Sequence, residues 1–128
     1  MKTSHVAPLS MIVGLAIGAG CIQALHAQNK PPAYLISEIE VTNPDGYQKE
    51  FLPAATPTIK AHGGRILAAG PPTSFSGAAP TSRASILQFD TMEQLQAWFN
   101  SPDYQKAREI GLKYATYRSF AVPGAASP

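Results

Sequence analysis

The chain has 128 residues, of which 45% are hydrophobic and 14% are charged. This length fits one domain rather than two, and the composition is that of a globular chain rather than a disordered one. The net charge is +2, and no run of Lys or Arg concentrates it. A nucleic acid or an anionic membrane surface requires a basic face, so neither is an expected partner.

The first 27 residues have the features of a secretory signal peptide. Lys2 supplies a basic start, residues 9–19 form an apolar run, and Ala27 stands before Gln28 at the expected cleavage site. The apolar run is shorter than the roughly 20 residues that span a bilayer, so no stable membrane span is expected. We predict export to the periplasm or the medium, with a retained membrane anchor as the alternative.

The only cysteine, Cys21, lies within this signal region. Residues 18–21 resemble a bacterial lipoprotein box, except that Gly18 stands where the box prefers Leu. A lipid anchor through Cys21 is therefore the alternative to free export. If cleavage follows Ala27, the mature chain has no cysteine, which excludes disulfides and a thiol nucleophile.

The mature chain is expected to begin with a short linker over 28–32 and then a strand over 33–42. The strand segment is rich in β-formers, and its second half alternates Glu with Ile and Val. Residues 43–45 are Asn-Pro-Asp, which stop the strand and cap a helix.

The helix that follows contains two prolines, Pro53 and Pro57. Each lacks an amide donor and clashes with the preceding turn, so one straight helix cannot hold both in its interior. The sequence therefore predicts two helical pieces, 44–52 and 57–62, with Thr56 capping the second.

Gly63-Gly64 is expected to end this segment through a left-handed turn. Strands are predicted over 65–69 and 82–89. The residues between them, 70–81, are rich in Gly, Pro, Ser and Ala and predict an exposed loop. Phe75 is the exception in this loop, and it is expected to pack against the body of the domain or against a partner chain.

The last part of the chain predicts a pair of helices and a strand. Residues 91–94 have the spacing of a capping box. An apolar stripe at helical period follows, made of Met92, Leu95, Trp98 and Phe99. Residues 101–103, Ser-Pro-Asp, cap a second helix over 102–110 that Gly111 closes.

A final strand over 116–122 precedes a loose tail over 123–128. The order β-α-β-β-α-β predicts an α+β, ferredoxin-like domain over 33–122, with both helical regions on one face of a four-stranded antiparallel sheet. The other face is expected to meet a second copy of the chain. Its expected positions are Tyr34, Ile36, Leu67, Ile86, Tyr117 and Ser119.

Four motifs, in this order, are similar to those of the domain of unknown function thirteen-thirty family. They are Asn-Pro-Asp-Gly-Tyr at 43–47, His-Gly-Gly-Arg at 62–65, Leu-Gln-Phe at 87–89 and Ala-Trp-Phe-Asn-Ser-Pro-Asp-Tyr at 97–104. The resemblance implies a ferredoxin-like fold that pairs into a dimeric α/β barrel. It implies no reaction, because the family as such has no established activity.

Four side chains are candidates for a ligand pocket, each with a structural alternative. His62, the only histidine after the signal region, suits a general base but also suits a helix C-terminus. Arg83 can bind an anion with two donors or lie solvated at a strand end. Trp98 and Tyr104 can line an apolar pocket or pack in the core.

No metal or cofactor is expected. One histidine with scattered carboxylates does not make a metal site, and the sequence has no phosphate loop or dinucleotide fingerprint. Two functions remain open. The favoured one is an exported, non-catalytic domain that dimerises or binds a small ligand. The alternative, by analogy with other dimeric α/β barrels, is a cofactor-free enzyme of the oxygenase or isomerase type, acting on a small apolar substrate between sheet and helices.

Overall fold

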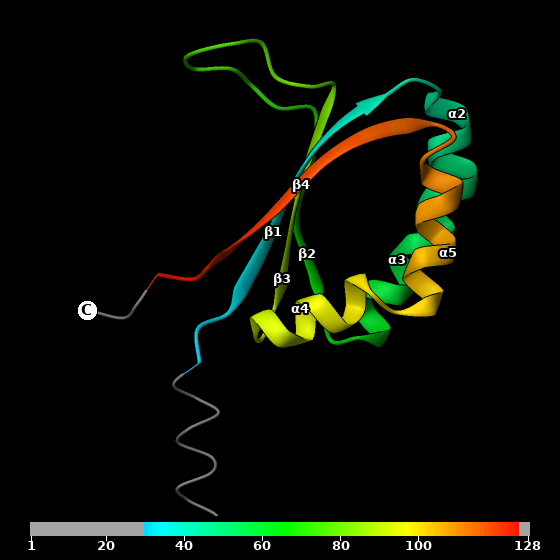
Figure 1. Cartoon of the computed structure of the whole chain (residues 1–128). Helices are drawn as coiled ribbons and strands as arrows, with labels where there is room; N and C mark the ends of the chain where they lie inside the picture. The colour runs from blue at the N-terminus through cyan, green and yellow to red at the C-terminus, as the bar shows by residue number, and fades with distance from the viewer. Residues whose placement is uncertain (1–29, 126–128) are drawn as a thin grey trace, which may run out of the picture. The chain divides into compact units, whose positions relative to one another are not determined.

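The computed structural model describes residues 30–125 (Figure 1). The predicted order of strands and helical regions is confirmed. The elements are β1 (Ala33–Val41), α2 (Pro44–Gly46), the π-helical η2 (Tyr47–Phe51), α3 (Leu52–Ala61), β2 (Arg65–Gly70), β3 (Arg83–Phe89), α4 (Met92–Phe99), α5 (Pro102–Gly111) and β4 (Ala115–Pro123).

The strands form one antiparallel sheet in the order β2-β3-β1-β4, and the helices lie on one side of it (Figure 1). This is the predicted α+β, ferredoxin-like arrangement. We call the sheet face toward the helices the inner face and the opposite one the outer face. Every second residue of β1 is buried on the inner face, namely Ala33, Leu35, Ser37 and Ile39.

Strand β4 turns different side chains inward than the sequence predicted. Ser119 lies opposite Ser37, and Tyr117 lies opposite Ile39. Directly opposed residues of a pair point to the same face of the sheet, so Tyr117 and Ser119 belong to the inner face. Their predicted place on the outer face is wrong, and Phe120 takes an outer position instead. The sequence did not reveal the inward face because each of the two alternating sets of β4 residues contains an aromatic and a polar residue.

Residues 44–61 form one continuous helical run, so the predicted break into two pieces is wrong. In η2 the hydrogen bonds span five residues instead of four. Pro53 is the second residue of α3 and follows η2 directly, so its missing amide falls where the hydrogen-bond pattern changes. Pro57 lies in the helix interior with its ring exposed, and α3 tolerates the loss of one hydrogen bond there. Thr56 is accordingly a residue within the helix and not a cap.

Three helix starts carry the caps that the sequence predicted. The side chains of Asn43, Thr91 and Ser101 each accept a hydrogen bond from the backbone N–H three residues later. A full capping box at Thr91 would have the Gln94 side chain accept from the Thr91 backbone N–H, whereas here Gln94 Nε2 donates to the His62 carbonyl oxygen at 2.8 Å. This bond ties the end of α3 to the start of α4.

Two glycines at helix ends have different roles. Gly63 has φ +79°, the left-handed conformation that ends α3 as predicted. Gly111 is the last residue of α5 and not the stop that the sequence predicted. A Cβ atom on Gly111 would lie 2.5 Å from both the Phe51 ring and the Tyr117 hydroxyl. Gly111 therefore allows these two side chains to pack close to the helix.

The segment between β2 and β3 extends away from the sheet (Figure 1), and Phe75 is 95% exposed. Phe75 therefore does not pack against the body of the domain, while a contact with a partner chain stays a prediction. At the C-terminal end, Pro123 pairs with Ala33 and the Gly124 N–H donates to the Pro32 carbonyl oxygen at 2.7 Å. Pairing thus continues past residue 122.

Buried side chains between the inner face and the helices form two clusters. The Trp98 cluster consists of Ala33, Leu35, Ile59, Leu87, Phe89, Leu95 and Trp98. The Tyr47 cluster consists of Ile39, Tyr47, Phe51, Ala55, Ala107 and Ala115. Tyr104 packs against both clusters.

The predicted signal peptide over 1–27 lies outside the described residues. Within residues 30–125, no helix has the length and apolar character needed to cross a membrane.

Candidate functional site

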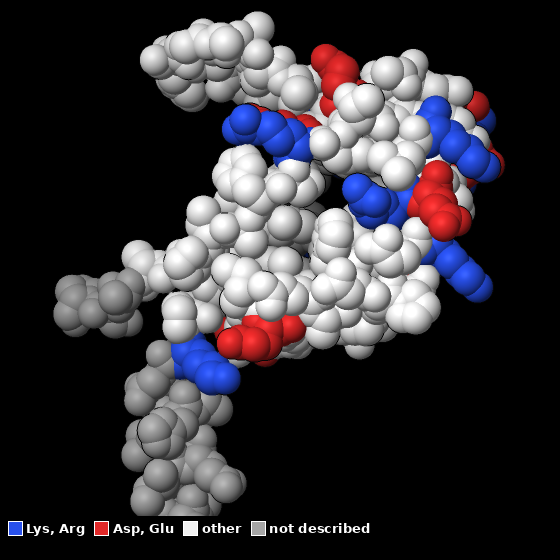
Figure 2. All heavy atoms as spheres, in the orientation of Figure 1, with Lys and Arg blue, Asp and Glu red and all other residues white. Residues whose placement is uncertain are grey.

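A cavity of about 310 Å³ lies between the inner face of the sheet and the helices. Figure 2 shows a hollow at this place, with Lys or Arg atoms beside it. The size is at the lower end of the range of about 300–1,000 Å³ that is typical of small-molecule sites. Apolar walls come from both clusters and include Leu35, Leu87, Ile59, Trp98, Phe51 and Ala55.

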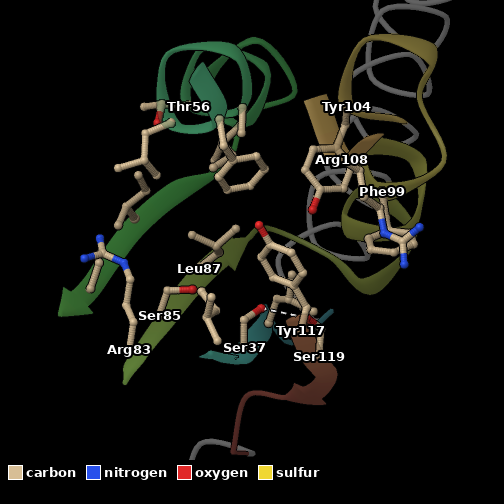
Figure 3. Close-up of a pocket in the computed structure, with 18 of the residues that line it drawn as sticks. Ser37, Thr56, Arg83, Ser85, Leu87, Phe99, Tyr104, Arg108, Tyr117 and Ser119 are labelled. Atoms are coloured by element: carbon tan, nitrogen blue, oxygen red, sulfur yellow. Dashed lines mark hydrogen bonds between the residues drawn. The ribbon is translucent and has the colours of Figure 1, made fainter. Parts of the chain in front are cut away.

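Hydroxyl groups line the cavity from the sheet and from α5. Ser37 Oγ and Ser119 Oγ lie 2.8 Å apart and hydrogen bond to each other, and Ser85 is their neighbour on β3. Figure 3 shows the hydroxyl groups of Tyr104 and Tyr117 directed toward the middle of the cavity. The interior therefore combines apolar walls with several hydrogen-bonding groups.

Two arginines lie on opposite sides of the cavity in Figure 3. Arg83 comes from β3, and its Cζ lies 5.6 Å from the centroid of the Tyr47 ring. Arg108 comes from α5, and its Cζ lies 5.6 Å from the centroid of the Phe99 ring. Neither guanidinium forms an ion pair with a described residue. No acidic side chain is among the described residues that line the cavity, so its fixed charge is positive.

Two buried polar atoms of the lining have no hydrogen-bond partner within the described part of the chain. They are Arg83 Nε and the Tyr117 hydroxyl oxygen. Leaving such a group unpaired costs about 1–3 kcal/mol, which is why buried polar groups are normally satisfied. The contrast is Trp98 Nε1, which donates to Thr58 Oγ1 at 3.0 Å, while that hydroxyl donates to the Ala55 carbonyl oxygen at 2.7 Å.

The tyrosines of the cavity act as hydrogen-bond donors at neutral pH. Burial raises the pKa of Tyr47, Tyr104 and Tyr117 above the ordinary value, and the charges of Arg83 on Tyr47 and of Arg108 on the other two oppose this only in part. The described lining contains no His, Asp, Glu, Lys or Cys, so it holds no side chain of ordinary basicity at neutral pH. Across residues 30–125 there is also no group of three His, Cys, Asp or Glu side chains that could hold a metal ion.

The sequence over residues 32–125 matches the family described as Domain of unknown function (DUF1330). The chain belongs to this family. The resemblance seen in the sequence motifs is thereby confirmed, and the family description carries no activity. No curated protein matches the chain.

Solved structures with the same fold extend over most of the domain. A protein of unknown function from Rhodopseudomonas palustris is 14% identical, with a TM-score of 0.60, and the match covers 83% of this chain and 93% of that one. SnoaB from Streptomyces nogalater, a cofactor-independent oxygenase, is 9% identical, with a TM-score of 0.56 and coverage of 76% and 96%. A protein from Agrobacterium tumefaciens is 17% identical, with a TM-score of 0.51 and coverage of 73% and 93%. At these identities the likeness concerns the fold.

The structure places three of the four candidate residues around one cavity. Arg83, Trp98 and Tyr104 line it, whereas His62 is not among the lining residues. His62 ends α3, and its Nε2 lies 3.2 Å from Asp103 Oδ1 at the start of α5. The His62 ring therefore connects the end of α3 to the start of α5, in agreement with the structural role at a helix C-terminus that was the alternative for this residue. The ligand-binding role of the other three stays a prediction.

Sequence reasoning missed several polar residues of the lining. Ser37 was detectable, because it lies among the inward residues of a strand whose other inward positions are apolar. Tyr117 and Ser119 were assigned to the other face of the sheet. Arg108 had no distinguishing signal, because an arginine near the end of a helix is usually solvated.

Proposed function

We propose that the chain is an exported ligand-binding domain that takes a small, mainly apolar organic molecule into the cavity between the sheet and the helices. The observation that carries this proposal is the cavity itself, whose apolar walls surround a few converging hydroxyl and guanidinium groups. Such a combination is typical of sites that bury a small molecule and orient it through a few polar contacts.

The chemistry of the lining supports binding more than catalysis. A general base is absent from the described lining, and the tyrosines are protonated at neutral pH, since the ordinary tyrosine pKa of about 10 is raised further by burial. The residue that seemed best suited to proton transfer, His62, contacts Asp103 outside the cavity. Arg83 and the tyrosines are instead suited to holding the oxygen atoms of a ligand.

A fluorescence titration with N-phenyl-1-naphthylamine, a neutral apolar dye, tests this proposal on the full chain. We expect saturable binding that is lost in Ser85→Phe, because Ser85 faces the cavity and a benzyl group there fills it. The matched control is Ala84→Phe, which adds the same group to the outer face of the same strand. Equal binding by both variants, or no binding by the unmodified chain, would contradict the proposal.

A cofactor-free enzyme is the second candidate, and the observation that favours it is the fold shared with SnoaB, a cofactor-independent oxygenase. In this alternative Arg83 and Tyr117 would stabilise a negative charge that develops on a substrate oxygen. An oxygen electrode with a series of dihydroxynaphthalenes tests it. Oxygen uptake that depends on the protein and is lost in Arg83→Gln would favour the enzyme over the binding domain.

We also propose that two copies pack through the outer face of the sheet. Large apolar side chains are exposed on this face, among them Ile86, Phe120 and Val122. A contiguous apolar face of this kind is typical of an interface. Sedimentation at micromolar concentration is expected to give twice the chain mass, and Ile86→Glu is expected to give the monomer. Lys106→Glu on α5 changes charge on the helical side and serves as the control.

Export rests on the sequence of the first 27 residues. The intact mass of the protein recovered from outside the cytoplasm tests it. We expect a chain that begins at Gln28, whereas a mass that includes Met1 would contradict cleavage. A chain that begins at a lipid-modified Cys21 would show the lipid anchor instead.

A further inference from the structure

The cavity contains a buried donor that requires an acceptor. Arg83 Nε is buried, and no described residue accepts its hydrogen. A guanidinium has five N–H donors and no acceptor, so a ligand at this position must present a lone pair. Two N–H groups of a guanidinium match the two oxygens of a carboxylate in a planar, bidentate pair.

The charge around the cavity favours an anion over a neutral acceptor. Arg83 and Arg108 lie on opposite sides of it, and neither forms an ion pair with a described residue. The lining within the described residues contains no acid that would neutralise them. Both arginines are half-buried and carry positive charge without an acidic partner, so an anionic ligand gains more here than a neutral one of the same shape.

Aromatic rings form much of the wall between these polar groups. Tyr47 and Phe51 have ring centroids 5.1 Å apart, Phe51 and Tyr117 5.7 Å, and Trp98 and Tyr104 4.0 Å. The first two separations are typical of favourable ring contacts and the third is closer still, and a planar ring inserted among them extends the same kind of packing. The walls therefore favour a flat, unsaturated body over a branched aliphatic one.

The second unpartnered atom, the Tyr117 hydroxyl oxygen, defines another polar contact. Tyr47 is near both groups: its ring is 5.6 Å from Arg83 Cζ, and its proximity adds to the effect of burial in raising the pKa of Tyr117. The protonated Tyr117 hydroxyl can both donate and accept one hydrogen bond. Both residues line the same cavity, so a ligand that pairs with Arg83 at one end can offer a hydroxyl or carbonyl group to Tyr117.

We infer that the ligand is a small aromatic carboxylate with a second oxygen on its ring, the carboxylate bound by Arg83 and the ring oxygen by Tyr117. This inference rests on the proposed function, because it assigns the chemical class of the molecule that fills the same cavity. Both unpartnered atoms are satisfied in such a complex.

Calorimetric titration of the full chain with 4-hydroxybenzoate tests this assignment, with 4-hydroxybenzamide and benzoate as comparison ligands. The amide keeps the shape and removes the charge, and benzoate keeps the charge and removes the ring oxygen. We expect 4-hydroxybenzoate to bind most tightly. Arg83→Gln is expected to weaken its binding by about 10- to 100-fold and to weaken the binding of the amide less, because the amide loses a hydrogen bond but no charge pair.

Tyr117→Phe gives an independent check on the other end of the ligand. We expect it to weaken 4-hydroxybenzoate about 5-fold and to leave benzoate unchanged, because benzoate has no ring oxygen to lose a partner. The matched control for Arg83→Gln is Arg65→Gln, which makes the same change at an arginine that lies outside the cavity beside Asp90.

The outcomes separate this inference from the proposed function. If the neutral dye binds and the amide binds as tightly as the acid, or Arg83→Gln changes nothing, the ligand class is wrong and the cavity remains a binding site. If neither the dye nor any of the three aromatic compounds binds, the proposed function itself is wrong.

Discussion

The Trp98 cluster and the Tyr47 cluster are built from similar side chains, but they treat their polar groups differently. In the Trp98 cluster the indole N–H is paired with Thr58, which is itself paired with a backbone carbonyl. In the Tyr47 cluster and beside it, Arg83 Nε and the Tyr117 hydroxyl are buried without partners among the described residues. Both clusters contribute walls to the cavity, but its unpaired polar atoms lie on the side of the Tyr47 cluster.

The paired indole and deep burial of Trp98 predict a large contribution to stability. Trp98 is 1% exposed and contacts Phe89, Phe99 and Tyr104 through its ring. We expect Trp98→Ala to lower the free energy of unfolding by about 3–5 kcal/mol, measured by urea denaturation. Phe120→Ala on the outer face removes an exposed ring and is expected to cost far less in the monomer. An equal loss of unfolding free energy in Trp98→Ala and Phe120→Ala would contradict a special contribution of Trp98 to stability.

Gly111 tests the packing of the Tyr47 cluster. A Cβ atom at this position would lie 2.5 Å from the Phe51 ring and the Tyr117 hydroxyl, so both side chains would have to move. We expect Gly111→Ala to destabilise the fold by about 1–3 kcal/mol, even though Ala favours helices. Lys106→Ala, on the exposed side of the same helix, is the control. A stabilised Gly111→Ala would show that this cluster is loose enough to absorb a methyl group.

A pair of substitutions sharpens the contrast between satisfied and unsatisfied hydroxyl groups. Thr58→Val removes the partner of the Trp98 indole and leaves a buried donor, which is expected to cost about 1–3 kcal/mol. Tyr117→Phe removes a hydroxyl that has no described partner, and with it the cost of burying an unpaired group, so it is expected to leave the free energy of unfolding unchanged or to raise it by up to about 1–3 kcal/mol. Thermal denaturation of both variants without ligand measures the difference. A larger loss for Tyr117→Phe would contradict the distinction.

Raising the pH into the alkaline range is expected to have the smallest and most gradual effect on the free energy of unfolding. The folded state holds the protons of Tyr104 and Tyr117 more tightly than the unfolded chain, since burial raises both pKa values. Their contribution is complete below the unfolded value of about 10, and stability falls as pH rises above it. Urea midpoints at successive pH values measure this fall. Tyr117→Phe is expected to reduce it, and Tyr34→Phe, on the outer face, is the control.

The fold was predictable because local signals agree with one another along the chain. The caps at Asn43 and Ser101, the left-handed Gly63 and the alternation in the first strand each point to the same element order. The break predicted at Pro57 failed because a helix packed on a sheet tolerates one lost hydrogen bond on its exposed side.

The site was less predictable, because a cavity is defined by contacts between elements that are far apart in the sequence. Arg83 and Tyr104 were recognisable as polar residues at element ends, but nothing local showed that they share a cavity with Arg108. The face of the sheet on which Tyr117 lies depends on which alternate residues of β4 point inward. The sequence of β4 does not decide this, because both alternate sets mix polar and apolar residues. His62 was the most conspicuous candidate, yet it ends a helix outside the cavity.

Energy transfer from Trp98 tests the central claim, that a small molecule binds between the sheet and the helices, most directly. Trp98 is the only tryptophan of the chain and lines the cavity. The emission of tryptophan overlaps the absorption of N-phenyl-1-naphthylamine, so dye bound in the cavity quenches Trp98 and emits in its place. We predict saturable transfer in the unmodified chain and in Ala84→Phe, and none in Ser85→Phe. Transfer that persists unchanged in Ser85→Phe, or dye fluorescence without transfer from Trp98, would contradict the account.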